Sequence, residues 1–500
     1  MSIKSNPARG LSNKGRLKFL LSDTIIYGLA SVLSKSLTLV TFPLLVRYLT
    51  IEEYGIIDYF LVLAGLLTTL FIFGQDSAVA RFFYEHEKIS IRKQLISQSL
   101  LFQLLISVLS IPLLWFYSDW LMGFVVGMND RVHLFKIVLL QLPFLLLINF
   151  SQNILKWTFS RTHFLVISIG FTVMQASLLV VAVLVIDVGI AEVLAIGLVA
   201  SIFFGALGLF FVRKWLVRPE DFSRIREMLP FAIPYGVICV VGSFLPALER
   251  TFTNSLLGAE SLGLYAAGAK LSMMIGLLVS AFQIAWGPFS LSIYKETDAA
   301  STFNWIFKIF TLAVCLATLL LTMSAYPLIR LLATDRFLDA VIVVFPLAMG
   351  LAIQAISWMT EIGIGITKRS NLSLLGYGAA IIASLAGIQL FTPIFGLFGV
   401  GLGILSGHIA KALVASYLAQ KVYPLPWQYA PVLLIISLTM CGGLAFSWVA
   451  EKMGILVGNL LLGVTMFLLI GVGWFALFSQ QERNRINELL FKLKIQIYHK

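Results

Sequence analysis

The sequence predicts an all-α polytopic membrane protein of about 14 transmembrane helices, arranged as two six-helix lobes in parallel repeat followed by two C-terminal helices. Of the 500 residues, 59% are hydrophobic and only 12% are charged, and the mean hydropathy is +0.95. A soluble protein carries about twice that share of charged residues. Apolar stretches of spanning length recur along the whole chain, and basic residues gather in alternate connections. Together these observations exclude a soluble protein.

The positions of the predicted helices follow from the thickness of a bilayer. A hydrocarbon core of about 30 Å requires about 20 apolar residues per helix. Strands of a membrane barrel would be about ten residues long and alternating, so longer stretches favour helices. Such stretches occur at residues 22–46, 54–73, 95–115, 134–155, 164–186, 193–212, 230–249, 264–289, 305–325, 341–366, 374–391, 398–419, 429–449 and 455–477. The first follows a basic segment at full spanning length, so we expect no cleaved signal peptide.

Lysine and arginine residues predict the orientation in the membrane. With an even number of spans both termini lie on one side, and the segments on that side hold 25 of the 36 basic residues. The connections on the other side hold 6, and basic residues favour the cytoplasmic side. We therefore expect both termini in the cytoplasm. The net charge of +12 is then explained by orientation, and binding of nucleic acid is the weaker explanation.

An internal match predicts the domain organisation. Residues 49–55 resemble residues 257–263 at an offset of 208, and Gln75 aligns with Gln283. Because six helices separate the copies, the two halves are expected to be parallel. The expected parts are a first lobe, a basic cytoplasmic linker, a second lobe, two extra helices and an amphipathic cytoplasmic tail, at residues 1–212, 213–229, 230–421, 422–478 and 479–500. The tail has the pattern of a helix lying on an anionic leaflet, with a short solvated tail as the alternative.

Polar residues recur at helical spacing inside several predicted spans. An ionisable side chain there costs a few kcal/mol or more, so it faces a cavity or a partner. If the second helix continues past Gly74, Asp58 and Asp76 lie five turns apart and point the same way. The first and tenth helices carry similar polar faces around Lys35 and Glu361. The fourth carries a polar group near its cytoplasmic end, made of Asn149, Gln152, Asn153 and Lys156. These faces predict a water-filled central cavity.

Catalytic and metal-binding patterns find little support. The five histidines show neither an HExxH motif nor paired metal spacing, and no large external loop is predicted to house a transferase site. Gly399, Gly403 and Gly407 form GxxxG spacings, which indicate close helix packing because no strand precedes them as a phosphate-binding loop would require. We expect no enzymatic activity, no cofactor and no metal.

A resemblance to a known family is carried by six segments: FPLLVRYLTIEEYGIIDYF at 42–60, LERTFTNSLLGAESLGLYAAGAKLS at 248–272, AFQIAWGPF at 281–289, GITKRSN at 365–371, TPIFGLFGVGLG at 392–403 and YPLPW at 423–427. They resemble bacterial polysaccharide-biosynthesis flippases, which are O-antigen flippase-like members of the multidrug/oligosaccharidyl-lipid/polysaccharide exporter superfamily. The resemblance implies alternating-access transport of a polyprenyl-diphosphate-linked oligosaccharide across the bacterial inner membrane, for cell-surface polysaccharide such as lipopolysaccharide. It also implies membrane lipids, a polysaccharide polymerase and glycosyltransferases of the same pathway as partners.

Candidate site residues follow from the charge of that cargo. A diphosphate that crosses a low-dielectric region needs cationic hydrogen-bond donors. The substrate-binding candidates are Lys35, Arg250, Lys270, Arg81 and Lys411. The candidates for coupling or ion pairing are Asp58, Asp76, Glu249 and Glu361. This family often ends the seventh helix in an Asp-Arg pair, where this sequence reads Glu-Arg. Adjacent residues do not face one another on a helix, so each needs a partner of its own.

Other interpretations stay open at this point. Arg81 lies near a predicted helix end, where its stem lets the guanidinium reach the headgroups without any substrate. Three lysines have stems long enough to reach a neighbouring carboxylate instead of a cavity: Lys35, Lys270 and Lys411. A drug or cation antiporter of the same superfamily would use acids such as Asp58 and Glu361 for coupling. A membrane enzyme would need a nucleophile and a base in register.

Overall fold

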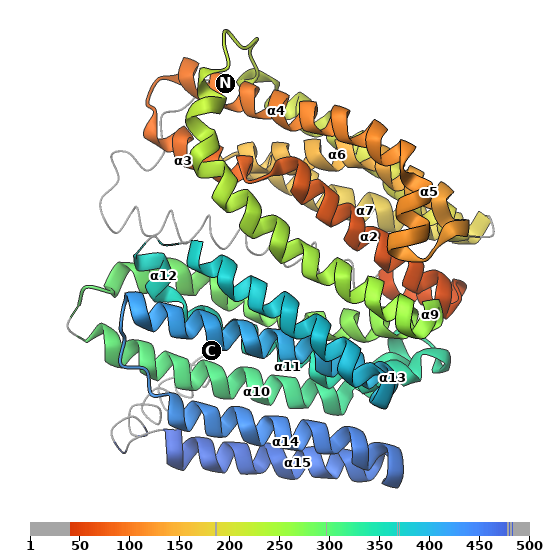
Figure 1. Ribbon diagram of the computed structural model, residues 1–500, viewed down its shortest axis with the longest axis vertical. Coiled ribbons are helices and arrows are strands. Elements are labelled where there is room, and N and C mark those ends of the chain that lie inside the picture. The colour runs from red at the N-terminus through yellow and green to blue at the C-terminus, as the bar shows by residue number, and fades with distance from the viewer. Residues whose placement is uncertain are drawn as a thin grey trace, which may run out of the picture. The chain divides into compact units, whose positions relative to one another are not determined.

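The computed structural model describes residues 41–185, 188–296, 298–367, 369, 371–477, 480 and 483. Regular structure over these ranges is helical, and eleven of the helices are long and apolar enough to cross a membrane (Figure 1). The predicted all-α polytopic fold is therefore confirmed. Most of the first predicted span, with Lys35, lies outside the described residues, and so does most of the C-terminal tail.

The long helices correspond closely to the predicted spans. The α-helices are α2 (Ile51–Ile72), α3 (Gln75–Glu85), α4 (Ile89–Phe116), α5 (Ser118–Trp120), α6 (Val132–Trp157), α7 (Arg161–Val185), α8 (Ile190–Val212), α9 (Ser223–Ile293), α10 (Ala299–Leu332), α11 (Val341–Thr360), α12 (Ile362–Ile366), α13 (Asn371–Val422), α14 (Tyr429–Met453) and α15 (Ile455–Val472). Non-helical dihedral angles divide α9 at Gly258 and α13 at Gly396. Each division falls between two predicted spans. The total of fourteen stays a prediction.

The first compact unit comprises residues 1–267 with 280–284 and 332–337. Its central helix is α6, which contacts α2, α4, α7 and α8 (Figure 1). Over half of the apolar window of α6 is buried, whereas α4 and α7 bury about a quarter of theirs. The outer faces of α4 and α7 expose leucine and valine side chains, as lipid-facing helices do.

The second unit comprises residues 268–279, 285–331 and 338–500. Helix α11 is its centre, because it contacts α13 and α14 and is buried at every residue from 343 to 350. Helices α14 and α15 pack against each other, and α15 leaves Leu456, Leu460 and Phe467 exposed (Figure 1). Contacts thus group residues 213–267 with the first unit. The lobes predicted from the sequence, at residues 1–212 and 230–421, were defined by an internal repeat and not by contacts. They stay a prediction.

The start of α2 is fixed by the first copy of the repeated segment. The hydroxyl of Thr50 accepts the N–H of Glu53 at 3.2 Å, and the Glu53 carboxylate accepts the N–H of Thr50 at 2.8 Å. This reciprocal capping satisfies two N–H groups that the helix leaves free. One turn later Gly55 packs against Gly263 of α9, so closely that a Cβ on either would meet backbone atoms of the other helix. The two glycines that the 208-residue offset aligns therefore touch.

The helix of the second predicted span ends before Gly74, so Asp58 and Asp76 lie on two different helices. Phe73 and Gly74 both adopt left-handed backbone angles, with φ of 42° and 73°, and α3 begins at the next residue. A Cβ at Gly74 would meet the backbone of α9 at Ala232 and Gly236. The close crossing admits only glycine at this φ, and the chain changes direction there. The condition under which Asp58 and Asp76 would share one continuous helix face is therefore not met.

Candidate functional site

Arg250 lies at the centre of a buried polar cluster in the first unit. Its Nε donates to Asp58 Oδ2 of α2 at 2.7 Å, and its Nη1 donates to the Pro246 carbonyl at 3.1 Å. The guanidinium also lies 5.3 Å from the ring centroid of Tyr265. The residue is 8% exposed, so its charge is balanced by Asp58 rather than by water. Two of the candidate residues from the sequence, far apart along the chain, thus form one ion pair.

Glu249 has a different partner from its neighbour, as expected for adjacent residues on a helix. Its Oε2 accepts the hydroxyl of Tyr265 at 3.0 Å, and the residue is only 6% exposed. Tyr265 follows the kink at Gly258, so the kink brings a donor back against the helix end that carries Glu249. Tyr59 follows Asp58 directly on α2, and its hydroxyl lies 2.9 Å from Thr251 Oγ1. The cluster therefore joins α2 to both parts of α9.

Lys411 forms the corresponding buried pair of the second unit. Its Nζ donates to Glu361 Oε1 at 3.1 Å, and Ser357 donates to the same oxygen at 2.8 Å. The ammonium also lies 4.9 Å from the ring centroid of Tyr377 and 5.9 Å from that of Trp358. Lys411 is 3% exposed. The structure therefore encloses this lysine between a carboxylate and two aromatic faces.

The other candidates are distributed differently. Arg81 of α3 is half exposed, pairs with Glu85 one turn away at 2.9 Å and covers the ring of Phe231 at 4.6 Å. Asp76 accepts the backbone N–H of Ser77 at 2.7 Å in the first turn of α3. Lys270 is half-buried on α9, after the kink. Lys35 lies outside the described residues.

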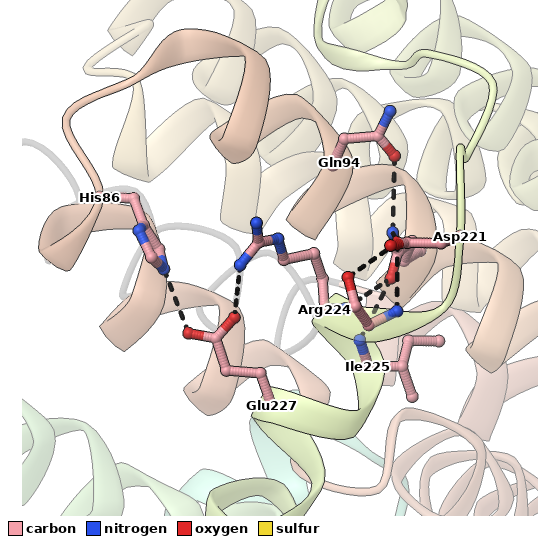
Figure 2. Close-up of polar contacts among 8 residues, drawn as sticks. His86, Gln94, Asp221, Arg224, Ile225 and Glu227 are labelled. Carbon is pink, nitrogen blue, oxygen red and sulfur yellow. Dashed lines mark hydrogen bonds and ion pairs between the residues drawn. The ribbon is translucent and has the colours of Figure 1, made fainter.

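A second polar cluster, not predicted from the sequence, ties the linker of the first unit to α4. Gln98 of α4 accepts the backbone N–H groups of Arg224 and Ile225 and donates to Asp221 at 3.2 Å. Glu227 accepts from Arg224 at 2.9 Å and lies 3.2 Å from a ring nitrogen of His86. Figure 2 shows these contacts at the start of α9. Gln98 thus takes the place of a helix cap for α9.

The sequence also held a signal for the cluster around Gln98. Gln94, Ser97 and Gln98 recur at helical spacing at the start of the third predicted span, and Ser97 accepts the N–H of Val217. Such a polar face predicts a partner. Nothing in the sequence marks Tyr265 as the partner of Glu249, because sixteen residues and a kink separate them.

Comparison with known proteins gives a family and several similar structures. The model of a family described as "Polysaccharide biosynthesis protein" matches residues 20–293, over half of the chain. An uncharacterized membrane protein of Haemophilus influenzae is 23% identical over 283 residues, which are 55% of this chain. The match spans 66% of that relative, slightly under two thirds of its length.

Several solved structures share the fold. The lipid II flippase MurJ in an inward closed conformation has a TM-score of 0.70 and 15% identity, over 91% of this chain and 100% of that chain. An inward-facing multidrug resistance MATE family transporter of the MOP superfamily has a TM-score of 0.62 and 14% identity, over 80% of this chain and 94% of that one. An outward-facing transporter of the same description has a TM-score of 0.61 and 15% identity, with 80% and 95% covered. At these identities the likeness establishes the fold.

Proposed function

Because the chain belongs to the polysaccharide biosynthesis protein family, we propose that it is a flippase for a polyprenyl-diphosphate-linked oligosaccharide. It carries this lipid from the cytoplasmic to the outer leaflet by alternating access. The observation that carries the proposal is the family match over residues 20–293, which contains the whole cluster around Arg250. The shared fold with a lipid II flippase supports it.

Arg250 is the principal cation for the diphosphate in this proposal. A guanidinium has five N–H donors, and two of them are used by Asp58 and the Pro246 carbonyl. Phosphate oxygens match the planar arrangement of these donors. Asp58 holds the positive charge in place between transport cycles, and the diphosphate replaces it when the lipid binds. The exchange keeps the guanidinium paired at every stage, which a low-dielectric environment requires.

The remaining candidates have secondary roles. Lys35, Lys270 and Arg81 supply further cations to the transport path, and Lys411 neutralises Glu361 in the second unit. Glu249 and Asp76 are the acids proposed for coupling, since neither has an ion pair to a described residue. Ion coupling by these acids would make transport depend on the membrane gradient.

The proposed setting is the bacterial inner membrane, with both termini in the cytoplasm and the two lobes at residues 1–212 and 230–421. The basic segment 213–229 lies on the cytoplasmic side, as the surplus of basic residues there favours. Glycosyltransferases of the pathway deliver the lipid-linked substrate, and a polymerase consumes it on the outer side.

Export of polysaccharide in a strain that lacks the native copy tests this function. Wild-type protein should restore surface polysaccharide. Arg250→Ala should cause the lipid-linked intermediate to accumulate, although the variant protein is present in the membrane at normal abundance. Arg131→Ala is the matched control, because Arg131 also pairs with acids, Glu52 and Asp130, in an exposed position of the same unit. Normal export by Arg250→Ala at normal protein abundance would contradict the role of Arg250. A null strain with unchanged polysaccharide would contradict the function itself.

A drug or cation antiporter is the second candidate. The shared fold with multidrug transporters favours it. An antiporter would change drug susceptibility in the null strain without changing polysaccharide, and Asp58→Asn would abolish that resistance. Measuring surface polysaccharide and drug susceptibility in the null strain therefore distinguishes the two functions.

A further inference from the structure

A small cavity in the core of the first unit is lined by Asp76, one of the two acids proposed for coupling. It lies where α2 ends and α3 begins, against the faces of α4 and α6. The cavity has a volume of about 10 Å³. This is roughly enough for one water molecule or one ion of similar size. Its polar lining is Gln75, Asp76, Ser99, Gln103, Asn149 and Asn153.

Gln75 shows that the cavity is built for an occupant. The residue is fully buried, and neither its amide oxygen nor its amide nitrogen has a hydrogen-bond partner among the described residues. A buried amide without a partner loses the hydrogen bonds that it makes with water in the unfolded chain, which is unfavourable. Because the Gln75 side chain lines the cavity, a molecule or ion bound there would supply the contact that the amide lacks.

The lining chemistry selects the occupant. The donors are oxygens of one carboxylate, of several side-chain amides and of a hydroxyl, with no histidine or cysteine, so the set suits a hard cation rather than a transition metal. A single carboxylate balances one positive charge, whereas Ca²⁺ sites in proteins usually hold several acids. Asp76 has no ion pair to any described residue. We propose that this cavity binds one monovalent cation, Na⁺, through Asp76, Gln75 and the amides of α6.

The broken helix suits this assignment. The end of α2 brings the negative end of a helix dipole to the cavity at Ile72, and the start of α3 brings a positive end. The two dipoles oppose each other, so the side-chain oxygens decide the sign of the ligand. Interrupted helices with oxygen donors are a recurring way to hold small cations in membrane transporters.

Lys156 is the rival cation for Asp76. It is the residue before the last of α6, and no ion pair joins it to Asp76 among the described residues. A stem of four carbons at a helix end allows the ammonium to reach the interface. The inference rests on the coupling role proposed for Asp76, and the experiment measures binding without transport, so the two can fail separately.

Binding is measured on the purified full chain in detergent micelles. The midpoint of thermal unfolding is followed as NaCl replaces choline chloride at constant ionic strength, and retention of ²²Na⁺ is counted on the same samples. The wild-type Tm should rise saturably by about 2–4 °C, with one ²²Na⁺ retained per chain. KCl should raise it less, because the larger ion does not fit the cavity.

Two variants remove the site and one controls for it. Asp76→Asn and Gln75→Leu should lose both the Tm rise and the retained ²²Na⁺, whereas Asp130→Asn, an exposed acid of the same unit, should keep them. A wild-type Tm that ignores the cation, with no ²²Na⁺ retained, would mean that the cavity holds water only and would overturn the proposal. Na⁺ binding that appears only in Lys156→Gln would show that the Lys156 ammonium neutralises Asp76 in the wild-type protein. That result would also overturn the proposal. If the cavity variants do not fold, the wild-type count alone decides.

Discussion

Two buried ion pairs among the described residues enclose their cations differently. In the first unit Arg250 meets Asp58 and a backbone carbonyl, and its guanidinium has further N–H donors. In the second unit the ammonium of Lys411 is held by Glu361 and by the faces of Tyr377 and Trp358, and the residue is 3% exposed. The comparison teaches that a buried charge is not by itself a substrate site. A cation with donors to spare can exchange partners, whereas an enclosed cation stabilises the fold.

Breaking the enclosed pair should have the largest effect on the protein. Lys411→Ala leaves Glu361 buried without a counterion, and such a loss costs about 3–5 kcal/mol. We expect membrane abundance to fall severely on an immunoblot, with export lost in proportion. The double variant Lys411→Met with Glu361→Gln should recover much of the abundance, since no charge is left unpaired. Normal abundance of Lys411→Ala would make Lys411 a candidate for substrate binding again.

A conservative change in the first pair should affect transport rather than folding. Arg250→Lys keeps the positive charge beside Asp58 but removes the planar set of donors that a phosphate matches. Export should fall about tenfold, equivalent to about 1.4 kcal/mol, at near-normal abundance. Arg131→Lys at the exposed pair should leave export unchanged. If Arg250→Lys loses abundance and export together, the two pairs have the same structural role.

The hydrogen bond beside the first pair should contribute less than either charge. Tyr265→Phe removes the hydroxyl that donates to Glu249, and one such bond is worth about 1 kcal/mol. We expect the Tm of the purified protein to fall by about 1–2 °C. In a Glu249→Gln background the amide oxygen needs the donor less than a carboxylate does, so the same change should cost less. Equal losses in both backgrounds would contradict a hydrogen bond to the charged acid.

The fold was predictable because hydrophobicity is a local property. Apolar length predicted the helices, and the breaks at Gly258 and Gly396 fall where the sequence separates two spans. The offset of 208 residues also aligned Gly55 with Gly263, which touch in the structure. The sequence left open whether the second helix continues past Gly74, because the close approach of α9 that requires a glycine there is a tertiary contact.

The site was predictable in its residues and not in its contacts. Rarity of charge inside apolar segments pointed to Asp58, Arg250, Glu361 and Lys411, and the structure pairs them. Which acid meets which base depends on helix packing, and spacing within one helix carries no such information. The same reason hid Gln75, whose unpaired amide is visible only once α4 and α6 surround it.

The smallest expected effect concerns an exposed acid and contrasts with both buried pairs. Hydrogen bonds from the side chain and backbone of Ser223 hold the pKa of Asp221 below its ordinary value of 3.8. A lowered pKa means that the folded state favours the charged form, so the contribution to stability is present above the ordinary value and is lost as the pH falls through the folded pKa. Asp221→Asn should therefore lower the Tm slightly at about pH 6, and the difference from wild type should shrink as the pH falls below the ordinary value and through the folded pKa. Asp130→Asn, whose acid pairs with Arg131 at the surface, controls for a general change in net charge. A difference that grows on acidification would have the wrong sign and would show that Asp221 stabilises the start of α9 in its protonated form.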